Sequence, residues 1–289
     1  MIKFYLENGA GVRVPLQDNE KFTWEPAGLG FGENREMSQI KYGFFAESKH
    51  DYVQPEMTGT MVFWEDVQDP YKSYEEFVDW VTKAEGLSLV YQPYEGRELY
   101  MDITVDSLEV PEPVLYGPLD CPVVFRGTSP YHKKNPLTFL FKTKESSNPM
   151  RFPFKFPFRF SDSGAGDAQV FTPTGHFPAA MELTINGPAS NIYFKCEDAV
   201  TGEVIGALDL TGVSVVAGDR VYYSSRPNAD GIWKISGNTR TDLMEFLNEN
   251  VENFFTLPVG REIRAKLTAD TTAGTEVTHA LRVHEYFKG

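Results

Sequence analysis

The sequence predicts a mainly β protein with a minor α component, divided into two domains. Its 289 residues exceed the usual size of one domain, so two domains are the first expectation. The 24 glycines and 19 prolines are spread along the chain and argue against a coiled coil or an all-helical bundle. Short alternating apolar runs between turn residues, above all in the second half, indicate β-strands.

The first half contains one predicted helix and several strands. Ser73 and Glu76 have the spacing of a capping box, and apolar residues follow at helical spacing up to a stop at Gly86. A β-hairpin is expected next, with its turn at Glu95-Gly96. Its strands cover 87–94 and 97–105, and two further strands are expected at 58–64 and 121–126. This half is therefore predicted to mix α and β structure.

The second half is predicted to be an antiparallel β-sandwich. Met181–Asn186 alternates apolar and polar residues, as a half-buried strand does. Regularly spaced short strands with turns between them are typical of a sandwich. The others are expected at 191–195, 203–210, 220–223, 231–235, 262–267 and 277–287. One short helix is expected at 242–248.

The two domains are expected to meet between residues 145 and 166. Lys144–Pro149 gives a polar break in the pattern, and Asp162–Asp167 gives a flexible one. We therefore expect a first domain at 1–145, a connecting segment at 146–166 and a second domain at 167–289.

The connecting segment contains an aromatic strap, residues 151–160, with phenylalanine at every second position. Its two prolines keep it extended and exclude it from the centre of a sheet. One interpretation is a strap packed across the domain junction, and the other is a partner-binding strap at a subunit interface. The candidate interface residues are Phe152, Phe154, Phe156, Phe158 and Phe160.

Charge and hydropathy exclude several classes of partner. The chain has 27 lysines and arginines against 41 acidic residues, a net charge of −14, which disfavours specific binding to nucleic acid or to anionic membranes. Nowhere do 18 consecutive apolar residues occur, so we expect no membrane span. An acid at position 7 interrupts the start of the chain, so we expect no secretory signal.

The sequence lacks the patterns that predict catalysis or metal binding. His279 and His284 are five residues apart in an expected strand and so point to opposite faces. Cys121 and Cys196 lie in separate strand-like runs and are expected to be buried free thiols. We therefore expect no enzyme, no metal site and no cofactor. A glycosidase built from two distant carboxylates stays open, because acids are numerous.

Several segments, in order, resemble the siphophage distal tail protein family. Three carry most of the resemblance: Asp120–Tyr131, Phe152–Phe158 and Phe177–Asn191. The pattern continues through shorter segments at 201–203, 208–210, 216–219 and 255–260. It covers most of residues 115–265, whereas the first 115 residues carry no diagnostic motif. Arg261-Glu262 departs from the family, which usually has an asparagine soon after the late Pro-x-Gly.

The resemblance implies an N-terminal split β-barrel with one helix and a C-terminal galectin-like antiparallel β-sandwich. It implies a structural protein of the virion, at the distal end of the phage tail, synthesised in the bacterial host cytoplasm. Its implied partners are five further copies of itself in a hexameric ring, the tail tube protein, and the tail-tip, baseplate or receptor-binding proteins. DNA would pass through the ring without specific binding, and no membrane is involved.

A galectin-like sandwich also raises an alternative function, a carbohydrate-binding module for saccharides of the host surface. Aromatic residues flanked by polar ones are its usual mark. Tyr222, Tyr223 and Trp233 are the candidates, although a core or interface role for Trp233 is favoured.

Overall fold

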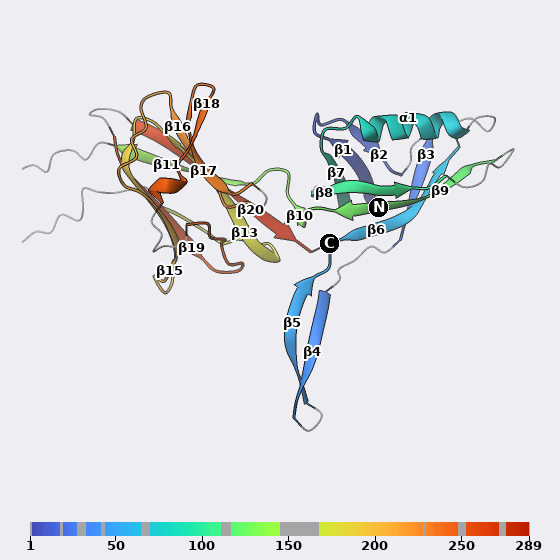
Figure 1. Cartoon of the computed structure of the whole chain (residues 1–289), viewed down its shortest axis with the longest axis horizontal. Coiled ribbons are helices and arrows are strands. Elements are labelled where there is room, and N and C mark those ends of the chain that lie inside the picture. Colours follow the sequence, from blue (N-terminus) through green and yellow to red (C-terminus); the bar gives the residue numbers. More distant parts are fainter. Residues whose placement is uncertain are drawn as a thin grey trace, which may run out of the picture. The chain divides into compact units, whose positions relative to one another are not determined.

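The computed structural model of the chain describes residues 2–17, 20–27, 33–41, 44–64, 70–110, 117–144, 168–227, 229–247, 253–271 and 276–288. It is mainly β with a single α-helix among these residues (Figure 1). The chain forms two compact units, residues 1–134 with 287–289 and residues 135–286. The expected boundary at 145–166 therefore differs from the observed one, which follows Lys134.

The first unit is an open antiparallel sheet with the order β2-β1-β7-β8-β9-β6-β3. β8 is long enough to serve two neighbours, because its residues 97–102 pair with β7 and its residues 103–108 pair with β9. Its strands are β1 (Lys3–Asn8), β2 (Arg13–Pro15), β3 (Phe22–Ala27), β6 (Glu56–Phe63), β7 (Leu87–Tyr94), β8 (Arg97–Leu108), β9 (Leu119–Gly127) and β10 (Tyr131–His132). A separate hairpin consists of β4 (Glu33–Lys41) and β5 (Phe44–Tyr52).

A single residue links the two ends of this sheet. The Leu16 N–H donates to the Phe4 carbonyl at 2.9 Å, and the Leu16 carbonyl accepts from the Trp24 N–H at 2.6 Å. Leu16, which directly follows the end strand β2, thus bonds to β1 on one side and to the other end strand, β3, on the other. Among the described residues no ladder joins β2 to β3, so the sheet is a split barrel and not a closed one. Trp24 fills its interior, with its ring at 5.2 Å from Phe4 and 5.3 Å from Phe125.

Helix α1 (Pro70–Thr82) confirms the predicted helix but not its predicted ends. It begins three residues before Ser73, so Ser73 lies buried in the first turn and the capping-box prediction is wrong. Proline suits the first helical position, because its φ is already helical and no N–H is needed there. Phe77 anchors the helix on the sheet, with its ring 5.1 Å from Phe22 and 5.9 Å from Phe63.

The second unit is a sandwich of two antiparallel sheets, as predicted. Six strands have the order β18-β17-β16-β13-β20-β11, and four have the order β12-β19-β14-β15. The first sheet contains β11 (Leu137–Lys144), β13 (Phe177–Asn186), β16 (Arg220–Ser224), β17 (Gly231–Ser236), β18 (Thr239–Asp242) and β20 (Glu276–Phe287). The second contains β12 (Ala168–Phe171), β14 (Ser190–Asp198), β15 (Val204–Leu210) and β19 (Ile263–Asp270).

Two of the resembling segments meet in this sandwich. A Cβ on Gly187 would lie 2.0 Å from the Val216 carbonyl oxygen, so only glycine allows the turn after β13 to approach the 216–219 segment this closely. The Gly187 N–H donates to the Asp219 carbonyl at 2.9 Å. These segments therefore serve turns and packing, as their composition suggests.

The expected helix at 242–248 is only a single 3₁₀ turn, η1 (Met244–Phe246). The Asp242 carboxylate accepts from the Met244 N–H at 2.8 Å, and Leu247 is already extended. A turn of three residues gains too few hydrogen bonds to continue as a helix.

Candidate functional site

The aromatic strap predicted as an interface, including Phe152, Phe154, Phe156, Phe158 and Phe160, lies outside the described residues. Its interface role therefore stays a prediction from the sequence. The described residues offer two other concentrations of charged and aromatic side chains, one on the sheet of the first unit and one on the six-stranded sheet of the second.

The described part of the chain brings no three metal-ligating side chains of the His, Cys, Asp and Glu types together. His279 is buried within the sandwich, where its Nδ1 accepts from the Asn186 N–H at 3.1 Å and its Nε2 lies 2.8 Å from the Thr143 hydroxyl. His284, on the same strand, instead lies 3.3 Å from the Glu182 carboxylate. The two histidines thus have different partners on different faces of the strand, as their spacing predicts.

Both cysteines are buried free thiols in separate units. Burial raises the pKa of the Cys121 thiol to about 11 and raises that of Cys196 as well. A thiol that stays protonated is a poor nucleophile. Neither cysteine is therefore suited to catalysis.

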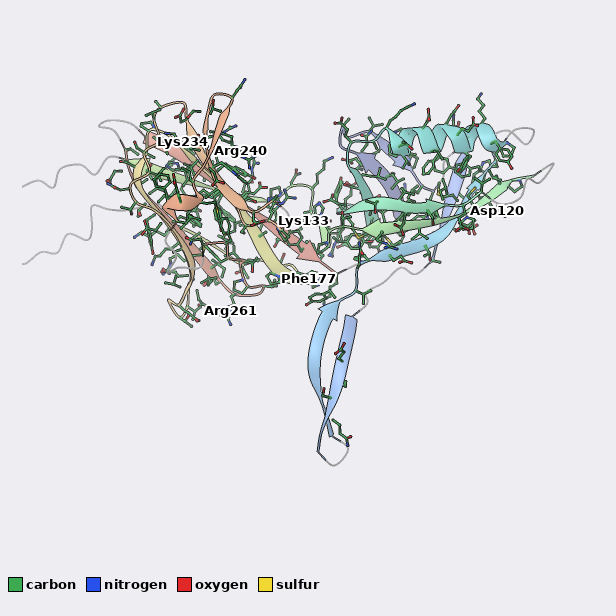
Figure 2. All side chains as sticks on the ribbon, in the orientation of Figure 1. Asp120, Lys133, Phe177, Lys234, Arg240 and Arg261 are labelled. Atoms are coloured by element: carbon green, nitrogen blue, oxygen red, sulfur yellow. The ribbon has the colours of Figure 1, made fainter. Side chains whose placement is uncertain are left out.

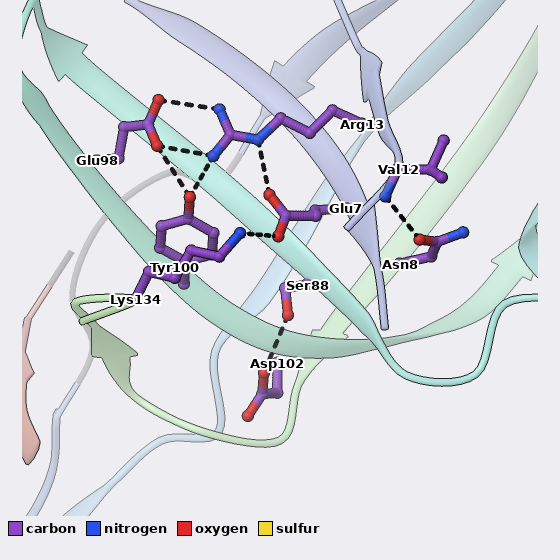
Figure 3. Close-up of polar contacts among 9 residues, drawn as sticks. All are labelled: Glu7, Asn8, Val12, Arg13, Ser88, Glu98, Tyr100, Asp102 and Lys134. Atoms are coloured by element: carbon purple, nitrogen blue, oxygen red, sulfur yellow. Dashed lines mark hydrogen bonds and ion pairs between the residues drawn. The ribbon is translucent and has the colours of Figure 1, made fainter. Parts of the chain in front are cut away.

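A cluster of ion pairs on the first unit centres on Arg13 (Figure 3). Its guanidinium binds Glu98 through two parallel hydrogen bonds of 3.0 and 2.7 Å, and its Nε donates to Glu7 at 2.6 Å. Arg13 also donates to the Tyr100 hydroxyl, which in turn donates to Glu98 at 2.9 Å. Lys134 completes the cluster with a 2.5 Å contact to the other oxygen of Glu7.

The register of the sheet explains why these side chains meet. Glu7 lies directly opposite Arg13 on β2 and opposite Ser88 on β7, so all three point to one face. Ser88 in turn faces Asp102 on β8, and its hydroxyl donates to that carboxylate at 3.0 Å. The result is a polar row across four strands, seen in Figure 3.

The charges in this Arg13 cluster stabilise one another. Burial opposes ionisation of Glu7, but contacts with Lys134 and Arg13 outweigh it and lower its pKa. The pKa of Glu98 is lowered chiefly by its hydrogen bonds from Arg13. Burial and the hydrogen bond to Glu98 raise the pKa of Tyr100 to about 12. Each charged group of the cluster has an opposite charge beside it, so we interpret the role of the cluster as structural. No local signal could have revealed it, because Glu7 and Lys134 are 127 residues apart.

The second concentration lies on the outer face of the six-stranded sheet. Trp233 on β17 stacks on Tyr222 of β16, with ring centroids 5.7 Å apart and planes at 17°. The Arg240 guanidinium of β18 lies 3.5 Å from the centre of the Trp233 ring (Figure 2 labels Arg240). Trp233 is therefore flanked on both sides along the sheet.

These contacts bear on the carbohydrate-binding alternative. Tyr223 belongs to the core and donates from its hydroxyl to the Asn253 carbonyl at 2.8 Å, so it cannot contact a ligand. A Cβ on Gly231 would lie 2.4 Å from Trp233, which shows that the indole lies close over that glycine. The indole is thus packed against its neighbours and offers no open platform for a sugar ring.

Comparison with known proteins identifies the first unit. Residues 3–128 match a family model described as the distal tail protein, N-terminal domain. Residues 3–128 thus carry the N-terminal domain of the distal tail protein family. The resemblance to this family, seen in residues 115–265, is thus confirmed. The matched region lies mostly in the first 115 residues, which carry no diagnostic motif. No curated protein sequence matches the chain.

Solved structures of phage tail components share the fold of this chain. The phage p2 baseplate in its activated conformation, solved with Sr and with Ca, contains chains of 12% and 13% identity, both at a TM-score of 0.60. The SPP1 Dit (gp 19.1) protein, described as a paradigm of the hub adsorption apparatus of phages that infect Gram-positive bacteria, has 9% identity and a TM-score of 0.63. Each match covers 98% of both chains. At this identity the likeness shows the fold alone.

Among the described residues, no helix is long and apolar enough to span a membrane.

Proposed function

We propose that this chain is a distal tail protein that forms a closed ring, most simply a hexamer, and joins the tail tube of a siphophage to its tail-tip or baseplate proteins. The observation that carries the proposal is the family domain at residues 3–128, which coincides with the split barrel of the first unit. Six copies related by rotation bury one heterologous contact per neighbour and leave no open end, which prevents filaments.

The distribution of charge supports a passage for DNA through such a ring. The first unit has 13 lysines and arginines against 23 acidic residues, net −10, and the second has 14 against 18, net −4. The acidity is thus concentrated in the unit that would line the ring. Acidic walls repel phosphates, so a duplex slides past them and does not adhere.

The ring has a direct test. Light scattering coupled to size exclusion, at tens of micromolar protein and low salt, should give a mass of several chains of 32.6 kDa each. Negative-stain images of the same fraction should show rings with a central hole. A monomer under these conditions, and again after addition of purified tail tube protein, contradicts the proposal.

The role we propose needs no catalytic activity. Incubation with host cell wall should release no reducing sugar above the buffer control. Release that a single Asp or Glu substitution abolishes would reinstate a two-carboxylate glycosidase.

A further inference from the structure

One face of the sandwich combines arginines and aromatic residues in continuous contact. It is the outer face of the six-stranded sheet, and five of its strands contribute. We call it the arginine–aromatic face and define it by Glu182, Tyr222, Arg226, Trp233, Arg240 and Arg282.

The strand register places these side chains on the same side. Glu182 on β13 lies directly opposite Arg282 on β20, and Tyr222 on β16 lies opposite Trp233 on β17. Directly opposed residues of antiparallel strands share a face. The alternate residues Leu183, Val221 and Ile232 are fully buried in the core, so Glu182, Tyr222 and Trp233 point outward. Arg226 follows β16 and joins this face through its contact with Glu182.

The contacts hold the arginines in place before any partner arrives. Arg240 lies over the Trp233 ring, as described above, and Arg226 donates to Glu182 at 3.1 Å. Arg282 approaches the same carboxylate at 4.0 Å and stays more than half exposed. Side chains ordered in advance lose less conformational entropy on binding.

The balance of charge on this face is positive in a protein of net −14. The defining residues carry three guanidinium groups and one carboxylate. Asp242, opposite Trp233, adds a second carboxylate that already accepts from the Met244 N–H at 2.8 Å, and exposed Arg220, opposite Ile235, adds a fourth guanidinium. At the far edge of the sheet, Lys142 and Glu276 neutralise each other at 2.8 Å. Arg240 and Arg282 are exposed, and within the part of the chain that the structure describes neither has a carboxylate closer than the 4.0 Å contact of Arg282 with Glu182.

We propose that the arginine–aromatic face is a docking surface for a protein partner that presents acidic side chains. Tryptophan, tyrosine and arginine are the residues that dominate binding energy at protein interfaces. A guanidinium stacked on an indole still offers its edge for two parallel hydrogen bonds to a carboxylate. The covered ring of Trp233 favours such a partner over a saccharide. The inference rests on the proposed connecting role, which requires a partner for the second unit.

A labelled acidic peptide tests this docking surface. Fluorescence anisotropy would follow the binding of a fluorescein-labelled peptide of about twelve glutamates to the full chain at low salt. Replacing Arg240→Gln and Arg282→Gln together should weaken binding by about tenfold or more. The matched control, Arg264→Gln with Lys266→Gln, removes two charges from the outer face of the other sheet and should change binding by less than about twofold.

Several outcomes contradict the inference. They are an absence of peptide binding, an equal loss in the control variant, or tighter binding of an anionic polysaccharide such as hyaluronate, which would assign the face to a glycan. The peptide assay measures binding at the arginine–aromatic face, whereas light scattering and imaging measure assembly of the ring. Failure of one can therefore be told from failure of the other.

Discussion

The Arg97 guanidinium lies over the ring of Phe287, 5.8 Å from its centre, although the two residues are far apart in sequence. Phe287 is 5% exposed and belongs to the core of the first unit, while the rest of β20 belongs to the sandwich. Lys133 approaches the same ring at 5.3 Å. The first unit therefore needs a residue that follows the second unit in the chain.

Phe287→Ala should destabilise the first unit. Loss of a buried phenylalanine costs about 3–5 kcal/mol of unfolding free energy. Denaturation followed by tryptophan fluorescence reads mainly this unit, because Trp24, Trp64 and Trp80 lie in it and only Trp233 in the other. Phe246→Ala, at a 45% exposed position of the second unit, is the control and should leave this transition unchanged. An unchanged midpoint in Phe287→Ala would contradict the assignment of Phe287 to this core.

Arg13→Met should also destabilise the first unit, because it leaves the buried Glu7 and the carboxylate of Glu98 without their shared guanidinium. Arg13 is about one third exposed, so the expected cost is about 1–3 kcal/mol, below that of a fully buried pair. Lys83→Met removes the exposed pair with Asp79 and should cost at most about 0.5 kcal/mol. Urea denaturation measures the free energy of unfolding of both variants. An equal loss in the two would show that the Arg13 cluster stabilises the fold no more than an exposed ion pair does.

Stability of the second unit should fall as pH drops from 6.5 towards 4, because of His279. Burial lowers the pKa of His279 to about 4 in the folded chain, against 6.5 for an ordinary histidine. Between these values the unfolded chain binds the extra proton and the folded chain does not, so acid favours unfolding. The loss between pH 7 and pH 5 should be about 2 kcal/mol, from the linkage of a single group.

The variant His279→Gln should flatten this pH dependence, because its amide can accept from Asn186 and donate to Thr143 without titrating. Exposed His176→Gln is the control and should keep the slope. Calorimetric unfolding between pH 7 and pH 5 measures both. Glu182, whose pKa is lowered to about 2 chiefly by His284, loses its contribution only below pH 4.5 and so leaves this window clear. A slope that survives in His279→Gln would place its source elsewhere.

The aromatic strap should be an ordered element. Phenylalanine at every second position gives it a continuous apolar face, and its prolines reduce the entropy lost on ordering. Replacing Phe154 and Phe156 with serine should loosen the link between domains or the ring by about 3–6 kcal/mol, at about 1.5–3 kcal/mol for each fully buried phenylalanine. Faster proteolysis of the variant within 151–160 would follow. Rapid cleavage there in the unmutated protein would instead identify a linker.

The sequence by itself determined most local elements and the resemblance to a family. The hairpin of β7 and β8 follows from alternating residues around Glu95-Gly96, where Gly96 has a φ of +87° that favours glycine. The family could be recognised because turn glycines and core positions recur in a fixed order along the chain. Both signals are local, so they can be seen without knowing which strands pair.

Only the tertiary structure decided which distant residues meet. Alternation predicts that the strand at Met181–Asn186 has one buried face, but it does not tell which strands lie beside it. For this reason the observed boundary follows Lys134 and not residues 145–166: β11 pairs with β20 and so belongs to the second unit. The same holds for Phe287 in the first core and for the contact of Glu7 with Lys134 across 127 residues. Such contacts arise from the packing of the whole sheet, and no short pattern encodes them.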